Sequence, residues 1–366
     1  MRRHAFLIWA GIIITGCAQG QSAENTHMDF EKYDPVSTLK VPEHPLSRAK
    51  YPFIDVHNHQ WNMGSQDLAG LVKDMDALHM QVMVNLSGSN GSRLKEMADN
   101  IKEHAPKRFI VFANIDFDGI GKPGWTEKAV QQLQEDVQHG AGGLKIFKTL
   151  GLSVKDNTGK RVTIDDPRLD AIWDKCAALK IPVLIHAADP EPFWEPMDEH
   201  NERWLELVSH PGRQRGPKNP APWEQIIEEQ HRMFKKHPQT TFINAHFGWY
   251  ANDLDKLSAL MEVIPNMYVE FGAVIAELGR QPIRAREFFE KYQDRILFGK
   301  DSWVPSEYAT YFRVLETADE YFPYHKKYHA FWRMYGMHLP DEILKKIYYK
   351  NALKIIPGID KGAFPD

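Results

Sequence analysis

Two histidines, His57 and His59, stand one residue apart at the end of the apolar run in FIDVHNHQWN, residues 53–62. In an extended strand alternate side chains share a face, so we expect Asp55 on the same face as both imidazoles. Two neighbouring imidazoles suit a divalent metal ion, although satisfied polar residues of a strand would show the same spacing. The pair by itself therefore leaves a metal site and a polar strand face as alternatives.

The elements that must position these residues follow a regular alternation from residue 51 onward. Apolar or β-branched runs alternate with longer segments whose apolar residues have helical spacing. We expect eight strands, at residues 53–59, 81–88, 109–117, 143–148, 181–189, 241–248, 267–273 and 296–303. Eight such units predict an α/β fold, a (β/α)₈ barrel with C-terminal helices after the last strand. A doubly wound open sheet is the alternative, but its glycine-rich phosphate turn has only a loose counterpart in GSNGS, residues 88–92.

Further polar residues fall at the carboxyl ends of the expected strands, where barrels of this kind build their active sites. The set comprises His57 and His59 on the first strand, Lys145 on the fourth, His186 on the fifth, His246 on the sixth and Asp301 on the eighth. A single strand-end histidine is usually structural, whereas four of them with an aspartate at one end of a barrel favour a metal ion. The combined pattern predicts a metal site at the mouth of the barrel.

Residues 51–356 resemble the amidohydrolase superfamily, in the amidohydrolase-2 branch that includes aminocarboxymuconate-semialdehyde decarboxylase. The matching stretches are FIDVHNH, GLKIFKTLGL, DDPRLDAIWDKCAALKIPVLIHAADP, FINAHFGW, ILFGKDSW and ILKKIYYKNALKII. The most specific of these signals is the His-x-His pair followed by two later histidines and a late aspartate. The resemblance implies a metal-dependent TIM-barrel enzyme.

The same resemblance implies a role for each of these residues. It makes His57, His59, His186 and Asp301 the ligands of a catalytic metal, zinc with manganese as the alternative. Asp301 would also accept the proton of an attacking water, and His246 would be a neighbouring acid or base, or a ligand of a second metal. Imidazole and carboxylate donors suit either ion, and an open position would lower the pKa of a bound water toward ~7.

Three further residues near this end keep open interpretations. Lys145 could be a carboxylated lysine that bridges two metals, a substrate-binding residue like its neighbour Lys148, or a residue facing the surrounding helices. Asp55 could orient a ligand by a hydrogen bond or be a satisfied core group. Glu270, on the seventh strand, has the same two interpretations, and the structural one is preferred.

The segment between the fifth strand and the next helix, residues 188–223, is long and rich in proline, tryptophan and arginine. Long loops in compact domains are usually functional or disordered, and three tryptophans argue against disorder. We interpret the segment as a lid over the metal site. Trp194 and Arg213 are predicted to bind the substrate, with Arg213 or Arg215 on a carboxylate, although a solvated surface arginine is the alternative.

The N-terminus has the layout of an export signal, with two arginines, an apolar stretch and small residues before Cys17. Its end, ITGC, resembles a bacterial lipobox, and a plain signal peptide is the alternative. We expect residues 1–17 to be a lipoprotein signal peptide, 18–50 a tether and 51–366 the barrel domain. The protein would then be exported and held at a membrane by its lipid alone, facing the periplasm or the cell surface.

The overall charge bears on the class of partner. A formal net charge of −4 without a long basic run excludes the electrostatic footprint of a nucleic-acid binder. We therefore expect a small-molecule substrate, and the sequence leaves open whether the protein forms a homo-oligomer.

These observations predict a metal-dependent hydrolase that uses a metal-activated water on a small carbonyl compound, such as a lactone, an ester or an amide. A non-oxidative decarboxylase of a small unsaturated or aromatic acid is the alternative, since the branch contains such enzymes and no residue separates the two. A ligand-binding barrel that has lost its chemistry would lack one of the metal-site residues, and none is missing. Lys300, before Asp301, stands where relatives commonly have a small residue, which weakens the transfer of any named substrate.

Overall fold

The computed structural model describes residues 28–327, 329 and 331–365, so the predicted signal peptide and its Cys17 lie outside the described residues. The chain divides into two compact units, Met1–Thr38 and Leu39–Asp366, and the boundaries predicted after residues 17 and 50 stay predictions. Among the described residues, no helix combines the length and the apolar character that crossing a membrane requires.

The larger unit is built on one eight-stranded sheet in which every pairing is parallel and strands adjacent in sequence are adjacent in space. Its strands are β1 (Phe53–Asn58), β2 (Met80–Asn85), β3 (Phe109–Asn114), β4 (Ala141–Ile146), β5 (Val183–Ile185), β6 (Phe242–Asn244), β7 (Met267–Glu270) and β8 (Ile296–Leu297). All eight predicted strands are confirmed in the predicted order. Most end earlier than predicted, because residues such as His186 and His246 leave the ladder and belong to the loops at the barrel mouth.

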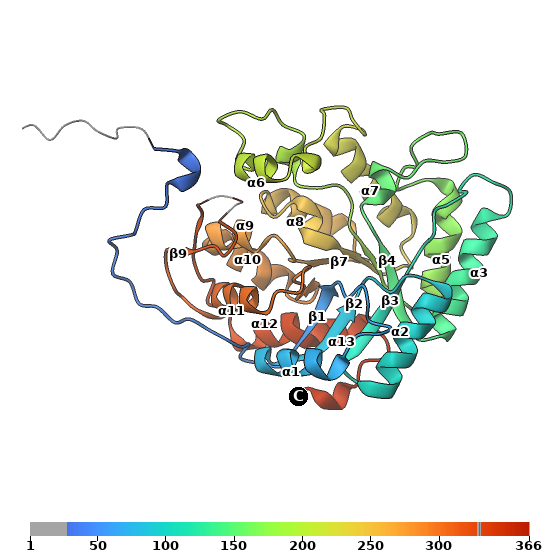
Figure 1. Cartoon of the computed structure of the whole chain (residues 1–366), viewed down its shortest axis with the longest axis horizontal. Coiled ribbons are helices and arrows are strands. Elements are labelled where there is room, and N and C mark those ends of the chain that lie inside the picture. Colours follow the sequence, from blue (N-terminus) through green and yellow to red (C-terminus); the bar gives the residue numbers. More distant parts are fainter. Residues whose placement is uncertain (1–27, 328, 330, 366) are drawn as a thin grey trace, which may run out of the picture. The chain divides into compact units, whose positions relative to one another are not determined.

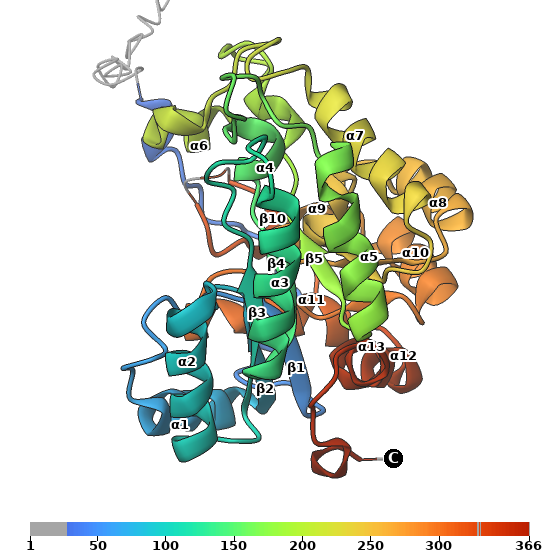
Figure 2. The same cartoon turned by 90° about the vertical axis from the view of Figure 1, so that its right-hand side faces the viewer.

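Helices connect the strands and cover the outside of the sheet (Figures 1 and 2). Between β1 and β8 they are α1 (Leu68–Leu78), α2 (Gly91–His104), α3 (Trp125–Gln138), α4 (Thr149–Leu152), α5 (Asp170–Leu179), α6 (Trp204–Ser209), α7 (Trp223–Lys236), α8 (Leu254–Val263), α9 (Ile275–Arg280) and α10 (Pro282–Tyr292). The predicted (β/α)₈ barrel is therefore confirmed.

Helix α1 shows how local sequence sets these boundaries. The Asp67 side chain accepts hydrogen bonds from two backbone N–H groups of the first turn, which would otherwise lack partners. The buried residues of the helix have helical spacing and are Leu68, Leu71, Met75 and Leu78. The helix ends at His79, whose left-handed backbone turns the chain toward β2.

The barrel closes between its first and last strands through single backbone hydrogen bonds. The Val56 N–H donates to the Phe298 carbonyl at 2.9 Å, and the Asp301 N–H donates to the His57 carbonyl at 2.6 Å. We call this junction the seam. Because β8 has only two residues, these bonds outside its ladder bring the carboxyl end of β1 beside the segment after β8.

The predicted insertion between β5 and α7 carries α6 and two single-turn 3-10 helices, Glu191–Phe193 and Pro211–Arg213. One groove is lined both by the start of α4, which follows β4, and by residues 214–216 and 219–220 of the insertion. The insertion therefore lies at the carboxyl end of the barrel. Its action as a lid stays a prediction.

The chain after β8 forms the C-terminal helices predicted from the sequence. They are α11 (Tyr308–Glu316), α12 (Asp341–Lys345), a π-helical turn (Lys346–Lys350) and α13 (Asn351–Ile355). A short antiparallel hairpin, β9 (Phe322–Pro323) with β10 (Arg333–Met334), separates α11 from α12. The π-helical turn packs under β8, whose neighbour Phe298 donates its N–H to the Ile347 carbonyl at 3.1 Å.

Candidate active site

His57, His59 and Asp301 meet at the seam. The Asp301 Oδ1 atom lies 3.4 Å from the Nε2 atom of His57 and 3.5 Å from that of His59. Asp301 has a φ of 84°, in the left-handed region that aspartate and asparagine tolerate better than most residues. This turn, together with the bond from its N–H to the His57 carbonyl, directs the carboxylate toward both imidazoles.

Glu270, the last residue of β7, is a buried carboxylate that fixes two histidines. Its Oε1 atom accepts hydrogen bonds from His57 Nδ1 and from the His246 N–H, each at 2.8 Å. Its Oε2 atom accepts from the Gly272 N–H at 2.6 Å. A Cβ at Gly299 would lie 2.1 Å from Oε2, so only glycine fits there. Glu270, interpreted from the sequence as structural, is thus a positioning residue for both histidines.

Asp55 fixes backbone rather than imidazole rings. Its Oδ1 atom accepts from the N–H groups of His57 at 3.0 Å and Lys300 at 3.1 Å. Its Oδ2 atom accepts from the Asn58 amide at 3.0 Å and from the Tyr308 hydroxyl at 2.6 Å. Burial raises the pKa of this carboxyl to about 6. Of the two interpretations, the satisfied core group fits, and Asp55 holds the backbone on both sides of the seam.

His246 and His186 lie against each other, with His246 Nε2 3.3 Å from His186 Nδ1. The His246 Nδ1–H donates to the Gly272 carbonyl at 2.6 Å, so the lone pair is on Nε2. The Trp249 ring stacks on His246, with ring centres 4.5 Å apart. His246 is therefore held as a hydrogen-bond acceptor that faces His186.

Lys145, on β4, is fully buried, and its ammonium has no hydrogen-bond partner among the described residues. Burial lowers its pKa to about 8. The ammonium lies 5.4 Å from the centre of the Phe147 ring, which stacks on the imidazole of His59. Its charge also acts on His57 and Asp301, which places it near the metal-site residues rather than among the outer helices.

Burial also sets the protonation of the imidazoles. Burial first, and the charge of Lys145 second, lowers the pKa of His57 far below its usual value and that of His59 to about 4. Burial followed by a neighbouring imidazole lowers the pKa of His186. Burial raises the pKa of Asp301, but the surrounding histidines, led by His57, outweigh it and hold this pKa well below its usual range. The site thus combines neutral imidazoles with an ionised carboxylate.

This donor set fits a divalent metal ion. Tetrahedral ligands about 2.1 Å from an ion lie roughly 3.4 Å apart, which matches the spacing of Asp301 from the two imidazoles. The Nε2 atoms of His57 and His186 are buried and lack a hydrogen-bond partner among the described residues. His57, His59 and Asp301 have ligand atoms within 4.8 Å of one another, so one ion can contact all three.

A cavity of about 150 Å³ opens beside this site. His186, His246 and Asp301 line its inner end. Its charged lining residues outside the metal site are Lys148, Asp189, Arg203, Glu206, Arg213 and Lys326. The cavity therefore connects the metal-site residues with a strongly polar surface of the insertion and of the β9–β10 segment.

Arg213, predicted to bind substrate, lines this cavity. Its side chain is 41% exposed, and its guanidinium donates to Glu206 at 2.6 Å. Arg215 donates to Asp189 at 2.8 Å, and Lys148 bonds to the same carboxylate. Binding of a substrate by Arg213 stays a prediction. The Glu206 carboxylate already holds the Arg213 side chain in place.

Trp194, the other insertion residue predicted to bind substrate, lies deeper. It is buried, and its indole N–H donates to the Ala221 carbonyl at 2.9 Å. Its neighbour Phe193 is the aromatic residue of this turn that lines the cavity. Trp194 thus holds the two ends of the insertion together, and its contact with a substrate stays a prediction.

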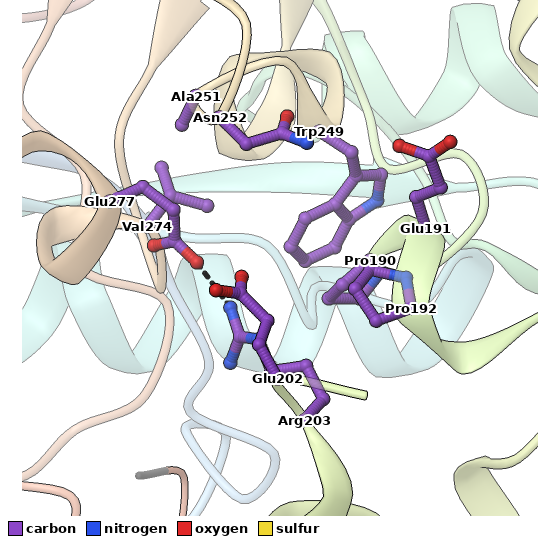
Figure 3. Close-up of a pocket in the computed structure, with 10 residues that line it drawn as sticks. All are labelled: Pro190, Glu191, Pro192, Glu202, Arg203, Trp249, Ala251, Asn252, Val274 and Glu277. Carbon is purple, nitrogen blue, oxygen red and sulfur yellow. Dashed lines mark hydrogen bonds and ion pairs between the residues drawn. The ribbon is translucent and has the colours of Figure 1, made fainter. Parts of the chain in front are cut away.

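Arg203, just before α6, is a cavity residue that was not predicted from the sequence. It is buried, donates to Glu206 at 3.0 Å and pairs with Glu277 of α9. Figure 3 shows this pair at a small second cavity, beside Trp249 and Pro190. Arg203 therefore ties the insertion to the helix after β7. No local pattern reveals it, because Arg203 and Glu277 are 74 residues apart in the chain.

A comparison with models of protein families matches residues 54–357 to the amidohydrolase family. The chain belongs to this family. The resemblance stated from the sequence motifs is confirmed, and the protein is an enzyme of the metal-dependent amidohydrolase type. A search of curated proteins finds no match for this amidohydrolase.

Solved structures with a similar fold include 2,6-dihydroxybenzoate decarboxylase from Rhizobium, 14% identical with a TM-score of 0.53, over 83% of this chain and 98% of that one. A dihydroxybenzoic acid decarboxylase from a Polaromonas species, with bound manganese and 2-nitroresorcinol, is 15% identical with a TM-score of 0.52, over 83% and 96%. An uncharacterised TIM-barrel protein from Bordetella bronchiseptica is 15% identical with a TM-score of 0.51, over 83% and 97%. At these identities the likeness shows the barrel fold.

Proposed function

We propose that this amidohydrolase hydrolyses a small, negatively charged carbonyl compound, such as a lactone, an ester or an amide, with a bound divalent metal. The observation that carries the proposal is the meeting of His57, His59 and Asp301 at the seam, with His186 and His246 beside them. Neutral nitrogen donors and one carboxylate around an open cavity are the features of a hydrolytic metal site.

In this proposal His57, His59, His186 and Asp301 hold the ion, zinc with manganese as the alternative. When bound, such an ion lowers the pKa of a water and polarises a carbonyl oxygen. Asp301 accepts the proton of the attacking water. His246 Nε2, with Nδ1 committed to a backbone carbonyl, takes this proton over from Asp301 and delivers it to the leaving group.

The charges around the cavity favour an anionic substrate. Lys148 and Arg215 share the single carboxylate of Asp189, so this side of the cavity carries more positive than negative charge. Arg213 is half-exposed and can turn part of its guanidinium toward a substrate carboxylate. We propose that the insertion, which carries Asp189, Arg213 and Arg215, covers the cavity as a lid.

A decarboxylase of a small unsaturated or aromatic acid is the second candidate, favoured by an aromatic surface at the seam. The rings of His59, Trp61 and Phe147 are within 29° of parallel, with centres 5.6 to 5.9 Å apart. Trp61 is 58% exposed, which is unusual for tryptophan, and exposed aromatic surface of this kind can stack on a planar acid. Two of the similar solved structures are decarboxylases of dihydroxybenzoic acids.

Isotope analysis separates the two candidates. The metal-loaded protein is incubated in water enriched in oxygen-18 with lactones, esters, amides, and aromatic or unsaturated acids. Hydrolysis places oxygen-18 in the product and releases no carbon dioxide, whereas decarboxylation releases carbon dioxide and places a solvent hydrogen on carbon. A purified protein that binds no divalent metal would contradict both candidates.

We also propose that the protein is exported and lipidated at Cys17, because two arginines and an apolar stretch precede ITGC. The protein should then partition with membranes, and Cys17→Ser should block lipidation and normal signal cleavage. Mass spectrometry of the mature N-terminus checks this. A mature protein without lipid that stays in the soluble fraction would contradict the proposal.

A further inference from the structure

Lys326 lies between β9 and β10 and lines the same cavity as His186, His246 and Asp301. Its side chain is half-buried. The cavity therefore has metal-site residues at its inner end and a lysine from a segment remote in the sequence on its lining. Nothing in the function proposed above uses this lysine.

The other flexible cations of the cavity already have carboxylate partners. Lys148 pairs with Asp189, and Arg213 pairs with Glu206 at 2.6 Å. Among the residues that the structure describes, Lys326 has no carboxylate within ion-pair distance. It is thus a cation at the cavity without an ion pair of its own among these residues, and its charge reaches Glu307 only from beyond ion-pair distance.

An acid that contacts this segment is committed elsewhere. Glu307, on the turn before α11, pairs with the buried ammonium of Lys300. The same carboxylate lies 3.5 Å from the Nε2 atom of His325, the residue before Lys326. The protein therefore supplies carboxylates to the neighbours of Lys326 but not to Lys326 itself.

A half-buried ammonium without a partner loses hydration and gains no ion pair in return. An anion that enters the cavity would supply the missing charge and a charge-assisted hydrogen bond. The metal-site residues at the inner end would hold the reacting group at the same time. One compound with two separated polar ends would therefore satisfy both positions.

We propose that Lys326 is the principal anchor of the substrate, through a carboxylate several bonds away from the reacting carbonyl, and is a specificity-determining residue. The inference rests on the proposed function for the group that the metal holds. Arg213, whose charge Glu206 already meets, has a secondary role in this assignment. The substrate class is a carbonyl compound with a remote carboxylate.

Binding of two simple acids to the zinc-loaded protein tests this assignment by isothermal titration calorimetry. Glutarate carries one carboxylate for the metal and one for Lys326, whereas butyrate, of similar length, carries only the first. We expect the wild type to bind glutarate more tightly, by about 10-fold to 100-fold, the range of one charge-assisted hydrogen bond. Lys326→Met should remove this preference and leave the affinity for butyrate unchanged.

Two further variants keep the test specific. Lys327→Met removes the same charge from the adjacent, exposed residue and should leave the preference for glutarate intact. Lys326→Arg keeps the charge and should retain most of the preference, and thermal melting confirms that each variant is folded. Equal affinities of the wild type for the two acids would overturn the proposal, as would a preference that survives in Lys326→Met.

The same experiment distinguishes the two levels of inference. Absence of turnover across the substrate panel would contradict the proposed function while the ratio of affinities still reports on Lys326. Turnover of neutral lactones or esters with an unchanged KM in Lys326→Met would support the proposed function and overturn the anchor.

Discussion

Two regions around the cavity are built in different ways. The floor consists of strand-end residues, His57, His59, Glu270 and Asp301, and the wall consists of charged residues of the insertion and the β9–β10 segment. On the floor, short side chains are fixed by backbone groups, as Glu270 is by the N–H groups of His246 and Gly272. On the wall, long side chains pair with one another.

This difference separates two functions. A metal site needs ligands held within a fraction of an ångström, which buried carboxylates with filled hydrogen bonds provide. A substrate-binding surface must order around its ligand, and a long cation such as Lys326 loses rotamer freedom when it binds. We therefore expect changes to the floor to act on the metal and on turnover, and changes to the wall to act on substrate affinity.

The largest effect is expected for Asp301→Asn. Asparagine fits the left-handed backbone at this position and keeps an oxygen donor, but it cannot accept a proton. Turnover should fall by about 10² to 10⁴-fold, the usual contribution of a positioned base, and metal content should fall less. Metal analysis alongside kcat on the identified substrate checks this. Full metal with wild-type turnover would remove Asp301 from the mechanism.

Glu270→Gln should weaken metal affinity by about 10-fold to 100-fold, because the new amide cannot accept bonds at both of its ends. The matched change is Glu277→Gln on α9, which alters the buried carboxylate paired with the wall residue Arg203 and should leave metal affinity unchanged. Competition with a chelator measures both. Equal losses of metal affinity in the two variants would show that burial of the carboxylate, and not its hydrogen bond to His57, determines the metal affinity.

Two glycines give the corresponding comparison for stability. Gly299→Ala places a methyl group 2.1 Å from Glu270 Oε2 and should cost about 1–3 kcal/mol of folding free energy. Gly212→Ala, on the wall, meets no atom within 4 Å and should change it by less than about 0.5 kcal/mol. Denaturant unfolding measures both changes in folding free energy. A Gly299→Ala protein as stable as the wild type would show that Glu270 can move aside without loss of stability.

Arg213→Met should raise KM by roughly twofold to tenfold with kcat and metal content near normal, because an exposed ion pair contributes little. Steady-state kinetics on the identified substrate gives the separation. A fall in kcat without a change in KM would show that Arg213 acts in the chemical step. It would contradict the assignment of substrate affinity to the wall and of turnover to the floor.

A separate effect is expected in the pH dependence of the metal-free protein. The unfolded chain protonates His59 near pH 6.5, whereas burial lowers the folded pKa to about 4. The unfolded state therefore holds more protons between these values, and stability is full above pH 6.5 and falls as the pH drops toward 4. The melting temperature of His59→Gln should decline less steeply over this range than that of the wild type, and parallel curves would contradict the assignment.

The floor was largely predictable because it follows two rules that act on sequence. Apolar runs give the strands, and the carboxyl ends of parallel strands in a barrel meet at one mouth, so His57, His59, His186, His246 and Asp301 could be placed together. The positioning role of Glu270 could not be decided from the sequence, since it depends on how the end of β7 meets His57 at the end of β1 and on the space that Gly299 leaves.

The wall was not predictable for a physical reason. Its order comes from pairs of long side chains distant in sequence, such as Arg203 with Glu277, which no periodicity encodes. Lys326 can be recognised only from the structure, because Lys300 and His325 have a carboxylate partner while Lys326 has none within ion-pair distance among the described residues. Trp194 is the opposite case. Its residue type suggested contact with a substrate. In the structure its indole N–H donates to the Ala221 carbonyl and so joins the two ends of the insertion.

The seam gives the floor a consequence for the architecture as a whole. His57 and His59 come from the first strand of the barrel and Asp301 follows the last, so nearly the entire barrel sequence lies between the ligands. A ligand held by all three would act as a cross-link that closes one very long loop of chain, and such closure disfavours the unfolded ensemble most strongly. Loss of the ion would then loosen the first and last strands from each other. Binding of the metal ion and closure of the barrel at the seam would then be one coupled equilibrium in this enzyme.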